Sequence, residues 1–215
     1  MRNLNVLIVG AGIGGLTSAL CLARKGHSVT VLEQSDVGDS GAGIQLSPNC
    51  SRVLYHLGLE AGLNLNGCQS EGTEIRDWKS AELIASFPFG MLRQLTGFPY
   101  YHIGRDDLIR LLVEKVLEEP LIDLRRNTRV IKFVQCSTGV SVSGEDIEIS
   151  GDVLLGADGI HSRVKQLMFG DRKPRFTGNY AWRASIPAEK LPSGFITSAA
   201  KLWWGPKKHF VHYPI

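Results

Sequence analysis

The sequence predicts an α/β fold in which a discontinuous domain, opened by a strand–helix–strand unit, is interleaved with a mostly antiparallel β domain. Three observations lead to this prediction. A short apolar run ends in a glycine-rich turn and continues into a helical pattern. Residues 72–98 break the alternation of strands and helices, and the chain after residue 179 is again β-rich and aromatic. We therefore assign residues 1–71 and 99–178 to the first domain, and residues 72–98 and 179–215 to the second.

The N-terminal unit has the pattern of a Rossmann-like dinucleotide site. The run NVLIVG is typical of a buried strand, and Gly10, Gly12 and Gly15 then fit the pattern GxGxxG. A helical pattern follows until Gly26, and SVTVLE predicts a second strand that ends at Glu33. In such a unit the first glycine permits the tight turn, the second lets the backbone approach a pyrophosphate, and the third lets the helix pack close to the strand. The terminal carboxylate accepts hydrogen bonds from a ribose diol, and the pyrophosphate meets the helix N-terminus.

The loop after this unit bears on which nucleotide binds, because GxGxxG does not distinguish FAD from NAD. A plain NAD domain usually continues with another strand and helix, whereas residues 41–49 have the sequence GAGIQLSPN. Gly41 and Gly43 indicate close approach of the backbone to a flat ligand, and the alternative is a simple connector. The segment SPN then predicts the start of a helix over about residues 51–57.

Further strands and helices follow along the chain. Two strands around a turn are predicted in TEIRDWKSAELIASFPFG. A helix is predicted after YYHIGRDDL, capped by Asp106 or Asp107 and closed by Pro120. Two short strands around Asn127 and a hairpin in VSVSGEDIEIS come next. Three more strands are predicted in YAWRASIP, AAKLWWGP and HFVHYPI.

A second glycine-rich turn, GADG, joins the apolar run DVLL to a predicted helix. Asp158 in this turn can fix neighbouring backbone N–H groups, or it can receive a contact from a ribose or an arginine. The alternative is an ordinary strand-to-helix turn in which Asp158 caps the helix.

Composition and charge exclude several function classes. The net charge is only +3, and the basic cluster of Arg125, Arg126 and Arg129 lies at a predicted turn, so we expect no nucleic-acid binding. The four cysteines have no CxxC spacing, and His209 and His212 would face opposite sides of a strand, so we expect no metal site. Glycines interrupt the apolar N-terminal run, which argues against a signal peptide or a membrane span. Scattered cysteines without a secretory signal fit a cytoplasmic protein.

The order of these motifs is similar to that of one enzyme family. With GxGxxG and Glu33, then GAGIQLSPN, IGRDDL and GADGIHSRVK, the sequence resembles the flavin-dependent aromatic hydroxylases, which are single-component FAD monooxygenases of the para-hydroxybenzoate hydroxylase type. Within them it resembles the salicylate hydroxylase-like branch, and the resemblance covers essentially the whole chain. It implies that NADH or NADPH, bound transiently, reduces FAD, that the reduced flavin captures dioxygen as a C4a-hydroperoxide, and that a small phenolic or salicylate-like ring attacks the distal oxygen.

The resemblance makes residues 1–71 and 99–178 the FAD-binding domain and residues 72–98 and 179–215 the substrate domain, and it assigns roles at the cofactor. Arg105 matches an arginine that reaches the FAD phosphates, for which a planar guanidinium is suited, and the alternative is a surface ion pair with a neighbouring aspartate. Val130, on the predicted strand TRVIKF, matches a position whose backbone touches adenine. Asp158 and Gly159 match a loop that lies near the pyrophosphate and also assists the transient nicotinamide.

On the substrate side, the resemblance assigns catalytic roles to Arg183 and Tyr213. Arg183 would hold a carboxylate or polarise a hydroxyl group, and Tyr213 would donate a hydrogen bond. For Tyr213, a packed tyrosine within a sheet is an equal alternative.

The sequence departs from the family at its third flavin motif, a Gly-Asp pair followed by residues similar to Ala-His-Pro. The Gly-Asp pairs of this chain are Gly38–Asp39 and Gly170–Asp171, and the second follows the helix after the second turn, which is a different element. We therefore expect a C-terminally truncated chain, the N-terminal half of a family member, that is inactive alone. The alternative is a non-catalytic remnant that binds a nucleotide weakly or not at all. The two loops disfavour a plain NAD(P) dehydrogenase.

Overall fold

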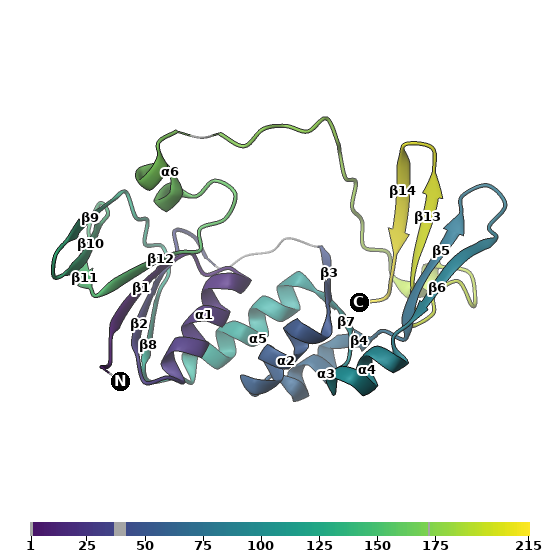
Figure 1. The fold of residues 1–215 in the computed structure, drawn as a ribbon, viewed down its shortest axis with the longest axis horizontal. Coiled ribbons are helices and arrows are strands. Elements are labelled where there is room, and N and C mark those ends of the chain that lie inside the picture. The colour runs from purple at the N-terminus through teal and green to yellow at the C-terminus, as the bar shows by residue number, and fades with distance from the viewer. Residues whose placement is uncertain (1, 37–41, 172) are drawn as a thin grey trace. The chain divides into compact units, whose positions relative to one another are not determined.

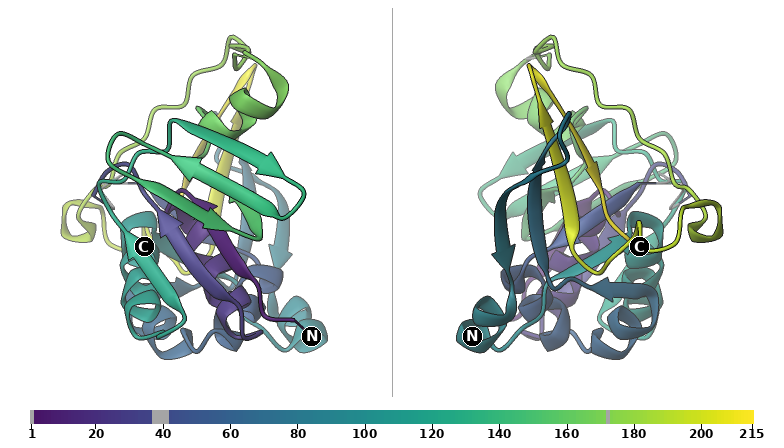
Figure 2. Two further views of the ribbon diagram at one scale, coloured as in Figure 1. Left: turned by 90° about the vertical axis from the view of Figure 1, so that its left-hand side faces the viewer. Right: turned by 90° about the vertical axis from the view of Figure 1, so that its right-hand side faces the viewer.

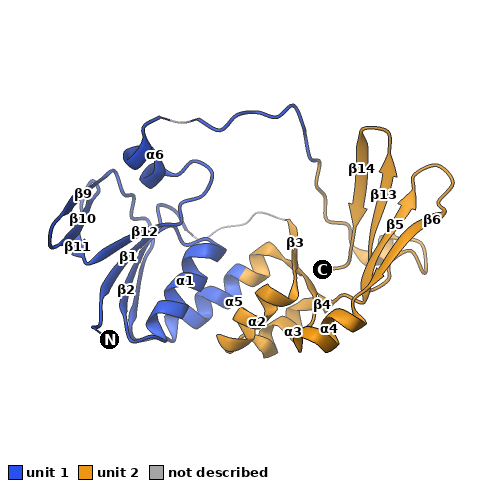
Figure 3. Cartoon of the chain, in the orientation of Figure 1, with its two compact units in different colours: residues 1–39, 109–181 blue, residues 40–108, 182–215 orange. Residues whose placement is uncertain are grey.

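The structure is a computed structural model that describes residues 2–36, 42–171 and 173–215 (Figure 1, with two further views in Figure 2). The chain forms two compact units, which have separate colours in Figure 3. Unit 1 comprises residues 1–39 and 109–181, and unit 2 comprises residues 40–108 and 182–215. The assignment of one domain to the cofactor and the other to the substrate stays a prediction.

Unit 1 is built around a parallel sheet. Its strands lie in the order β12-β1-β2-β8, and each neighbouring pair is parallel. The strands are β1 (Asn5–Val9), β2 (Ser28–Leu32), β8 (Ile122–Arg125) and β12 (Val153–Gly156). Helix α1 (Ile13–Ala23) connects β1 to β2, so the predicted strand–helix–strand unit is confirmed. On β1, which has a neighbouring strand on each side, the residues from Val6 to Val9 are buried on both faces of the sheet.

Two helices bury the apolar faces that their spacing predicts. In α1 the buried residues are Gly15, Leu16, Ala19, Leu20 and Ala23. Helix α5 (Arg105–Leu117) buries Leu108, Leu112 and Val116 in the same way, and the boundary between the two units falls within it. Positions three or four apart lie on one face of a helix, so each helix presents a continuous apolar stripe.

An antiparallel sheet lies beside the parallel one in unit 1 (Figure 2). Its order is β11-β10-β9, and its strands are β9 (Lys132–Cys136), β10 (Gly139–Ser143) and β11 (Glu148–Gly151). The pairing of β10 with β11 confirms the predicted hairpin. One core cluster joins both sheets to helix α6 (Arg163–Phe169), and it contains Leu7, Val9, Leu32, Val130, Val140, Val142 and Val164.

The two glycine-rich turns lie against each other at the carboxyl ends of β1 and β12. Val9 is paired with Gly156, and the N–H group of Ala157 donates a hydrogen bond to the Val9 carbonyl at 2.8 Å. Gly10 has φ +104°, and a Cβ atom there would lie 2.4 Å from the carbonyl oxygen of Ala157. A Cβ atom on Gly15 would lie 1.9 Å from the carbonyl oxygen of Gly10. The packing of the chain on itself therefore requires both glycines.

The described part of unit 2 contains two sheets. The smaller one is antiparallel, in the order β3-β7-β4, with β3 (Gly43–Leu46), β4 (Gly67–Gln69) and β7 (Tyr101–Gly104). The larger one has the order β14-β13-β5-β6 and is antiparallel except between β13 and β5. Its strands are β5 (Gly72–Asp77), β6 (Leu83–Pro88), β13 (Ala200–Gly205) and β14 (Lys208–His212). The strand pair predicted around KSAE is β5 with β6.

One tyrosine fixes two helices of unit 2 to the smaller sheet. The helices of the described part of this unit are α2 (Pro48–His56), α3 (Glu60–Asn66) and α4 (Gly90–Thr96), and a short 3₁₀ helix spans Ala188–Lys190. Helix α2 begins after Ser47 with Pro48 in its first turn, where SPN predicts a helix start. The fully buried Tyr101 of β7 shares hydrogen bonds with the Tyr55 hydroxyl of α2 at 2.7 Å and with Oδ1 of Asn64 of α3 at 2.5 Å.

The prediction of a strand in YAWRASIP is wrong. Residues 180–187 have no regular secondary structure, and Trp182 is 96% exposed. A strand needs a hydrogen-bonded neighbour, and within the described chain no strand pairs with residues 180–187. Alternation of apolar residues alone therefore does not make this segment a strand.

We expect Gly15→Ala to destabilise unit 1, because its methyl group would overlap the carbonyl oxygen of Gly10. Overpacking of this kind costs about 1–3 kcal/mol. Gly14→Ala is the matched control, since a Cβ atom there meets no atom within 4 Å, and alanine is favoured over glycine within a helix by about 0.5–1 kcal/mol. Urea unfolding followed by circular dichroism gives the free energy of unfolding of both variants. Equal stability of the two would contradict the tight packing of the turns.

Candidate functional site

The first turn leaves an open space at Gly12. This residue is the N-cap of α1, with φ −75° and ψ −180°, which any residue can adopt. A Cβ atom on Gly12 would meet no atom within 4 Å. Unlike Gly10 and Gly15, it is therefore explained by neither strain nor packing within the described chain. Its missing side chain leaves a cradle at the start of a helix.

The helix start behind Gly12 offers groups that bind an anion. No side chain caps α1, which is 11 residues long, and no acidic residue lies in its first turn. The first backbone N–H groups of a helix have no partner within the helix, and the helix dipole adds positive charge there. A Cβ atom on Gly14 would also lie in open space, so nothing obstructs this end. The cradle and the helix start together fit the phosphates of a dinucleotide.

Glu33 braces the first turn, a role that the sequence analysis missed. Its Oε2 accepts a hydrogen bond from the N–H group of Ala11 at 2.8 Å, and its Oε1 accepts from the N–H group and the hydroxyl of Ser35, both at 3.0 Å. The Glu33 carbonyl accepts from the N–H group of Thr128 at 2.7 Å. Each carboxylate oxygen can accept two hydrogen bonds. Glu33 therefore keeps capacity for a ribose hydroxyl while it holds the turn.

Asp158 caps helix α6. Its Oδ2 accepts hydrogen bonds from the N–H groups of Arg163 at 2.6 Å and Val164 at 3.0 Å, and its Oδ1 accepts from the Ser162 hydroxyl at 2.5 Å. The Ser162 hydroxyl in turn accepts from the N–H group of Lys165 at 3.0 Å. Both carboxylate oxygens thus serve the helix start, as the capping alternative predicts.

Two backbone positions of unit 1 border these turns. Gly159 has φ +76°, which favours glycine, and a Cβ atom there would meet nothing within 4 Å. Val130 lies just before β9 rather than on a strand, and its side chain belongs to the core cluster. The N–H groups of Thr128 and Ile131 are hydrogen-bonded, whereas no main-chain hydrogen bond of Val130 is present in the described chain. A ligand at Val130 would supply that partner.

In unit 2 a ring of the chain itself lies on Gly43. A Cβ atom on Gly43 would lie 2.9 Å from Cε2 of Tyr213 and 3.1 Å from its hydroxyl oxygen. The phenol ring of Tyr213 therefore lies against the backbone of Gly43, and the predicted approach of a flat ligand there stays a prediction. Gly41 lies outside the described residues. Burial raises the pKa of Tyr213, and the positive charge of Arg183 opposes that rise, so these two residues are close enough to interact.

Arg105 lies next to the same loop. It begins α5, and its N–H group donates a hydrogen bond to the carbonyl of Ala42 at 2.8 Å. The site residues thus form two groups, one around the turns of unit 1 and one around β3 and β7 of unit 2.

His102 belongs to the second group and was missed by the sequence analysis. It is 0% exposed on β7, and neither ring nitrogen has a hydrogen-bond partner within the described chain. Burial lowers the pKa of its imidazole to about 4. The sequence could have indicated this residue. Side chains alternate along a strand, so Tyr101 and Ile103 share one face and His102 lies on the opposite face.

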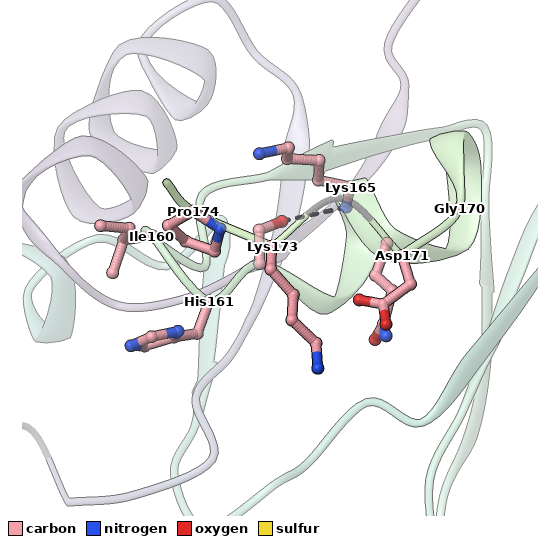
Figure 4. Close-up of a pocket in the computed structure, with 9 residues that line it drawn as sticks. Ile160, His161, Lys165, Gly170, Asp171, Lys173 and Pro174 are labelled. Atoms are coloured by element: carbon pink, nitrogen blue, oxygen red, sulfur yellow. Dashed lines mark hydrogen bonds between the residues drawn. The ribbon is translucent and has the colours of Figure 1, made fainter. Parts of the chain in front are cut away.

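A polar pocket of about 190 Å³ lies beside the second turn (Figure 4). Figure 4 shows His161 and Lys173 extending to one side of the ribbon and Lys165 to the other, with the carboxylate of Asp171 close by. Its charged lining consists of two lysines, Lys165 and Lys173, and one carboxylate, that of Asp171.

Metal binding and membrane insertion find no support in the described residues. There, no group of three or more His, Cys, Asp or Glu side chains is placed to hold a metal ion. Within the same residues, none of the helices combines the length and apolarity that a bilayer crossing requires.

Comparison with known proteins agrees with this geometry. The FAD binding domain family matches residues 3–184. The 3-hydroxybenzoate 6-hydroxylase 1 of Aquipseudomonas alcaligenes is 39% identical over 214 residues, which are 98% of this chain and 54% of that protein. The 3-amino-4-hydroxybenzoate 2-monooxygenase PtnB3 of Streptomyces platensis is 37% identical over 213 residues, which are 98% of this chain and 53% of that protein. The chain thus spans about half the length of the curated relatives it matches.

Solved structures share the fold. CtdE in complex with FAD is similar with a TM-score of 0.77 at 22% identity, over 98% of this chain and 55% of that chain. The p-nitrophenol 4-monooxygenase PnpA from Pseudomonas putida DLL-E4 is similar with a TM-score of 0.70 at 25% identity, over 79% of this chain and 44% of that chain. These likenesses confirm the predicted α/β fold class.

The buried imidazole of His102 predicts an acid sensitivity. Its pKa falls from the ordinary 6.5 to about 4, so between these pH values the unfolded chain binds a proton that the folded chain does not. The free energy of unfolding therefore falls as pH drops through this window, by at most about 1.4 kcal/mol per pH unit from this group. We expect His102→Phe to flatten that slope in urea unfolding measured between pH 7 and 4. An identical slope in both proteins would show that the imidazole is not buried in its neutral form.

Proposed function

The chain belongs to the FAD binding domain family, and from this premise we propose that it is the FAD-binding part of a flavin-dependent aromatic hydroxylase. The observation that supports this most directly is Gly12, whose glycine nothing in the described chain requires. An open cradle at an uncapped helix start is where a dinucleotide places its pyrophosphate.

The cofactor contacts that we propose in unit 1 involve groups around its two glycine-rich turns. The N-terminus of α1 and Gly12 would receive the pyrophosphate, and Glu33 would accept from the ribose while it braces the turn. Val130 would present its backbone to adenine. Asp158 would contribute indirectly, by holding the start of α6 in place through its hydrogen bonds. Gly159, which has no side chain, would let the ligand approach the second turn.

Unit 2 would supply the remaining contacts. We propose that the guanidinium of Arg105 reaches a phosphate and that the backbone at Gly41 and Gly43 receives a flat ring. Arg183 carries a positive charge that suits a substrate carboxylate. The pKa of Tyr213 is raised by burial, so its phenol stays protonated at neutral pH and can donate a hydrogen bond to the substrate.

The reaction class follows from the cofactor and the relatives. When bound, FAD supplies the redox chemistry, accepting a hydride from NADH or NADPH and activating dioxygen. One oxygen atom then enters the aromatic ring as a hydroxyl group, and the other leaves as water. The names of the two curated relatives include hydroxybenzoates or their amino derivatives. A small phenolic acid is therefore the substrate class that we propose for the whole protein, with residues of this chain binding, orienting and shielding it from water.

A second candidate is a non-catalytic remnant that binds nucleotide without turnover. Nucleotide binding needs only the open cradle at Gly12 and the uncapped start of α1, and neither of these requires a reaction. Flavin binding and turnover separate the two candidates, because the remnant would at most bind the nucleotide.

We expect Gly12→Val to abolish FAD binding and to leave the fold intact. The valine side chain would fill the cradle, but it would meet no protein atom within 4 Å of its Cβ and its backbone would not be strained. FAD titration followed by flavin fluorescence should show an affinity loss of at least about tenfold, with urea unfolding unchanged to within about 0.5 kcal/mol. Unchanged FAD affinity in Gly12→Val would remove the main support for the proposed site.

We also expect the 215 residues alone not to turn over. These residues match 54% of the length of the hydroxybenzoate hydroxylase relative, and we expect turnover to need residues from the rest of that length. The assay supplies FAD, NADH or NADPH, and 3-hydroxybenzoate, and it measures nucleotide oxidation and hydroxylated product separately. Peroxide without hydroxylated product is the most activity expected. Hydroxylation at rates of about 1–10³ per second would show that these residues suffice.

A further inference from the structure

His102 is a buried polar side chain that the packing of the fold does not explain. It lies on the middle strand of the smaller sheet, is 0% exposed, and has neither ring nitrogen hydrogen-bonded within the described chain. A buried polar group without a partner costs about 1–3 kcal/mol. Phenylalanine or leucine would fill the same position without that cost. An unsatisfied group of this kind points to a partner outside the described chain.

Tyr213 is the side chain that covers this imidazole. The two ring centroids are 4.7 Å apart, and the ring planes are inclined by 39°. The same phenol ring rests on the backbone of Gly43. His102 is paired with Gln45 on β3 and with Cys68 on β4, so these three residues lie on one face of the sheet.

A phenol ring therefore already fits this place. The side chain of Tyr213 is a phenol on a single methylene, and it sits against a bare glycine backbone and a polar imidazole. A free phenolic ring has the same thickness and the same apolar body with one polar end. Such a ring could replace the tyrosine ring when Tyr213 turns aside. The imidazole would then meet a hydroxyl group on the incoming ring.

We propose that His102 is a specificity-determining residue that recognises the hydroxyl group of a phenolic ring bound on this face of β3, β7 and β4. The inference rests on the proposed function, because it names the substrate group that the hydroxylase would read. A neutral imidazole donates from one nitrogen and accepts at the other, so it can satisfy a hydroxyl in either direction. A site that hydrogen-bonds a hydroxyl rejects the analogue that lacks it.

The groups around His102 favour an uncharged hydroxyl. Burial keeps the imidazole neutral at neutral pH, with a pKa of about 4. Burial also raises the pKa values of the phenols of Tyr100 and Tyr213 and of the thiol of Cys68, so these neighbours are neutral as well. Arg183 is the positive charge that acts on Tyr213, and it would receive a carboxylate on the same ligand. A hydroxybenzoate combines both groups on one ring.

The test compares 3-hydroxybenzoate with benzoate, which differ by one hydroxyl group. Binding of each to the 215-residue chain is measured by calorimetry at pH 7 for wild type, His102→Phe and His102→Gln. We expect the wild type to prefer 3-hydroxybenzoate by about tenfold, which is the loss expected when a buried hydrogen-bonding group is left unpaired. His102→Phe should lose this preference and keep its affinity for benzoate. His102→Gln should keep part of it, because an amide can still donate and accept.

His212→Phe is the matched control. His212 is also a histidine among aromatic rings, with Nε2 unpaired in the described chain, but it lies on β14 of the larger sheet and stacks on Phe195 at 4.7 Å. It should keep the full preference. Full preference in both His102 variants overturns the inference, and so does a wild type that binds both ligands equally or binds neither. Circular dichroism checks folding, and His102→Gln decides the matter if His102→Phe does not fold.

FAD titration of the same proteins keeps this inference separate from the proposed function. A wild type that binds FAD but shows no preference for the hydroxylated ligand overturns only the role of His102. The opposite outcome is a wild type that does not bind FAD but prefers the hydroxylated ligand, with that preference lost in His102→Phe. This outcome overturns only the flavin assignment.

Discussion

The close contact between the two glycine-rich turns is the constraint on which the rest of unit 1 depends. Strands β1 and β12 are parallel neighbours, so their turns leave the sheet at the same edge. Neither Gly10 nor Gly15 has room for a methyl group, because the carbonyl oxygens of Ala157 and Gly10 occupy that space. Only this approach allows α1 to start close to the strands and leaves Gly12 facing open space. The second turn is thus a structural partner of the first.

Unit 2 shows the same division between residues that hold the fold and residues that leave a place for a ligand. Tyr101 and His102 are consecutive on β7 and are both completely buried. The tyrosine hydroxyl bonds to α2 and α3, whereas the imidazole on the opposite face has no polar partner in the described chain. Because side chains alternate along a strand, one strand can anchor helices on one face and present a chemical group on the other.

Local patterns in the sequence predicted the parts of the fold whose partners are close along the chain. The strand–helix–strand unit and the hairpin of β10 with β11 are set by apolar spacing and by glycine stops. The contact between Gly10 and Ala157 was not predictable, because it depends on β12 pairing with β1 from far along the chain. YAWRASIP has the alternation of a strand, but no strand of the described chain pairs with it. The spacing of apolar residues indicates which structure a segment can adopt, and pairing with neighbouring strands decides whether it forms.

The candidate site was predictable in its residue types and less so in their roles. GxGxxG and Glu33 were found from spacing, yet the bond from Ala11 to Glu33 depends on the shape of the turn. Asp158 was left between two roles, and hydrogen bonds to α6 account for both of its oxygens. His102 has no motif of its own, and only its complete burial without a partner draws attention to it.

The open space at Gly12 also has a consequence for how damaging substitutions would behave in a cell. Proteases and chaperones respond to the fraction of a protein that is unfolded. A side chain at Gly10 or Gly15 disturbs packing, so such variants would be removed and the protein would become scarce. A side chain at Gly12 disturbs nothing in the chain, so that variant would accumulate at normal abundance while lacking its ligand. Quality control would therefore not detect a substitution at Gly12, the glycine of the three that the fold does not require and that we propose for the ligand.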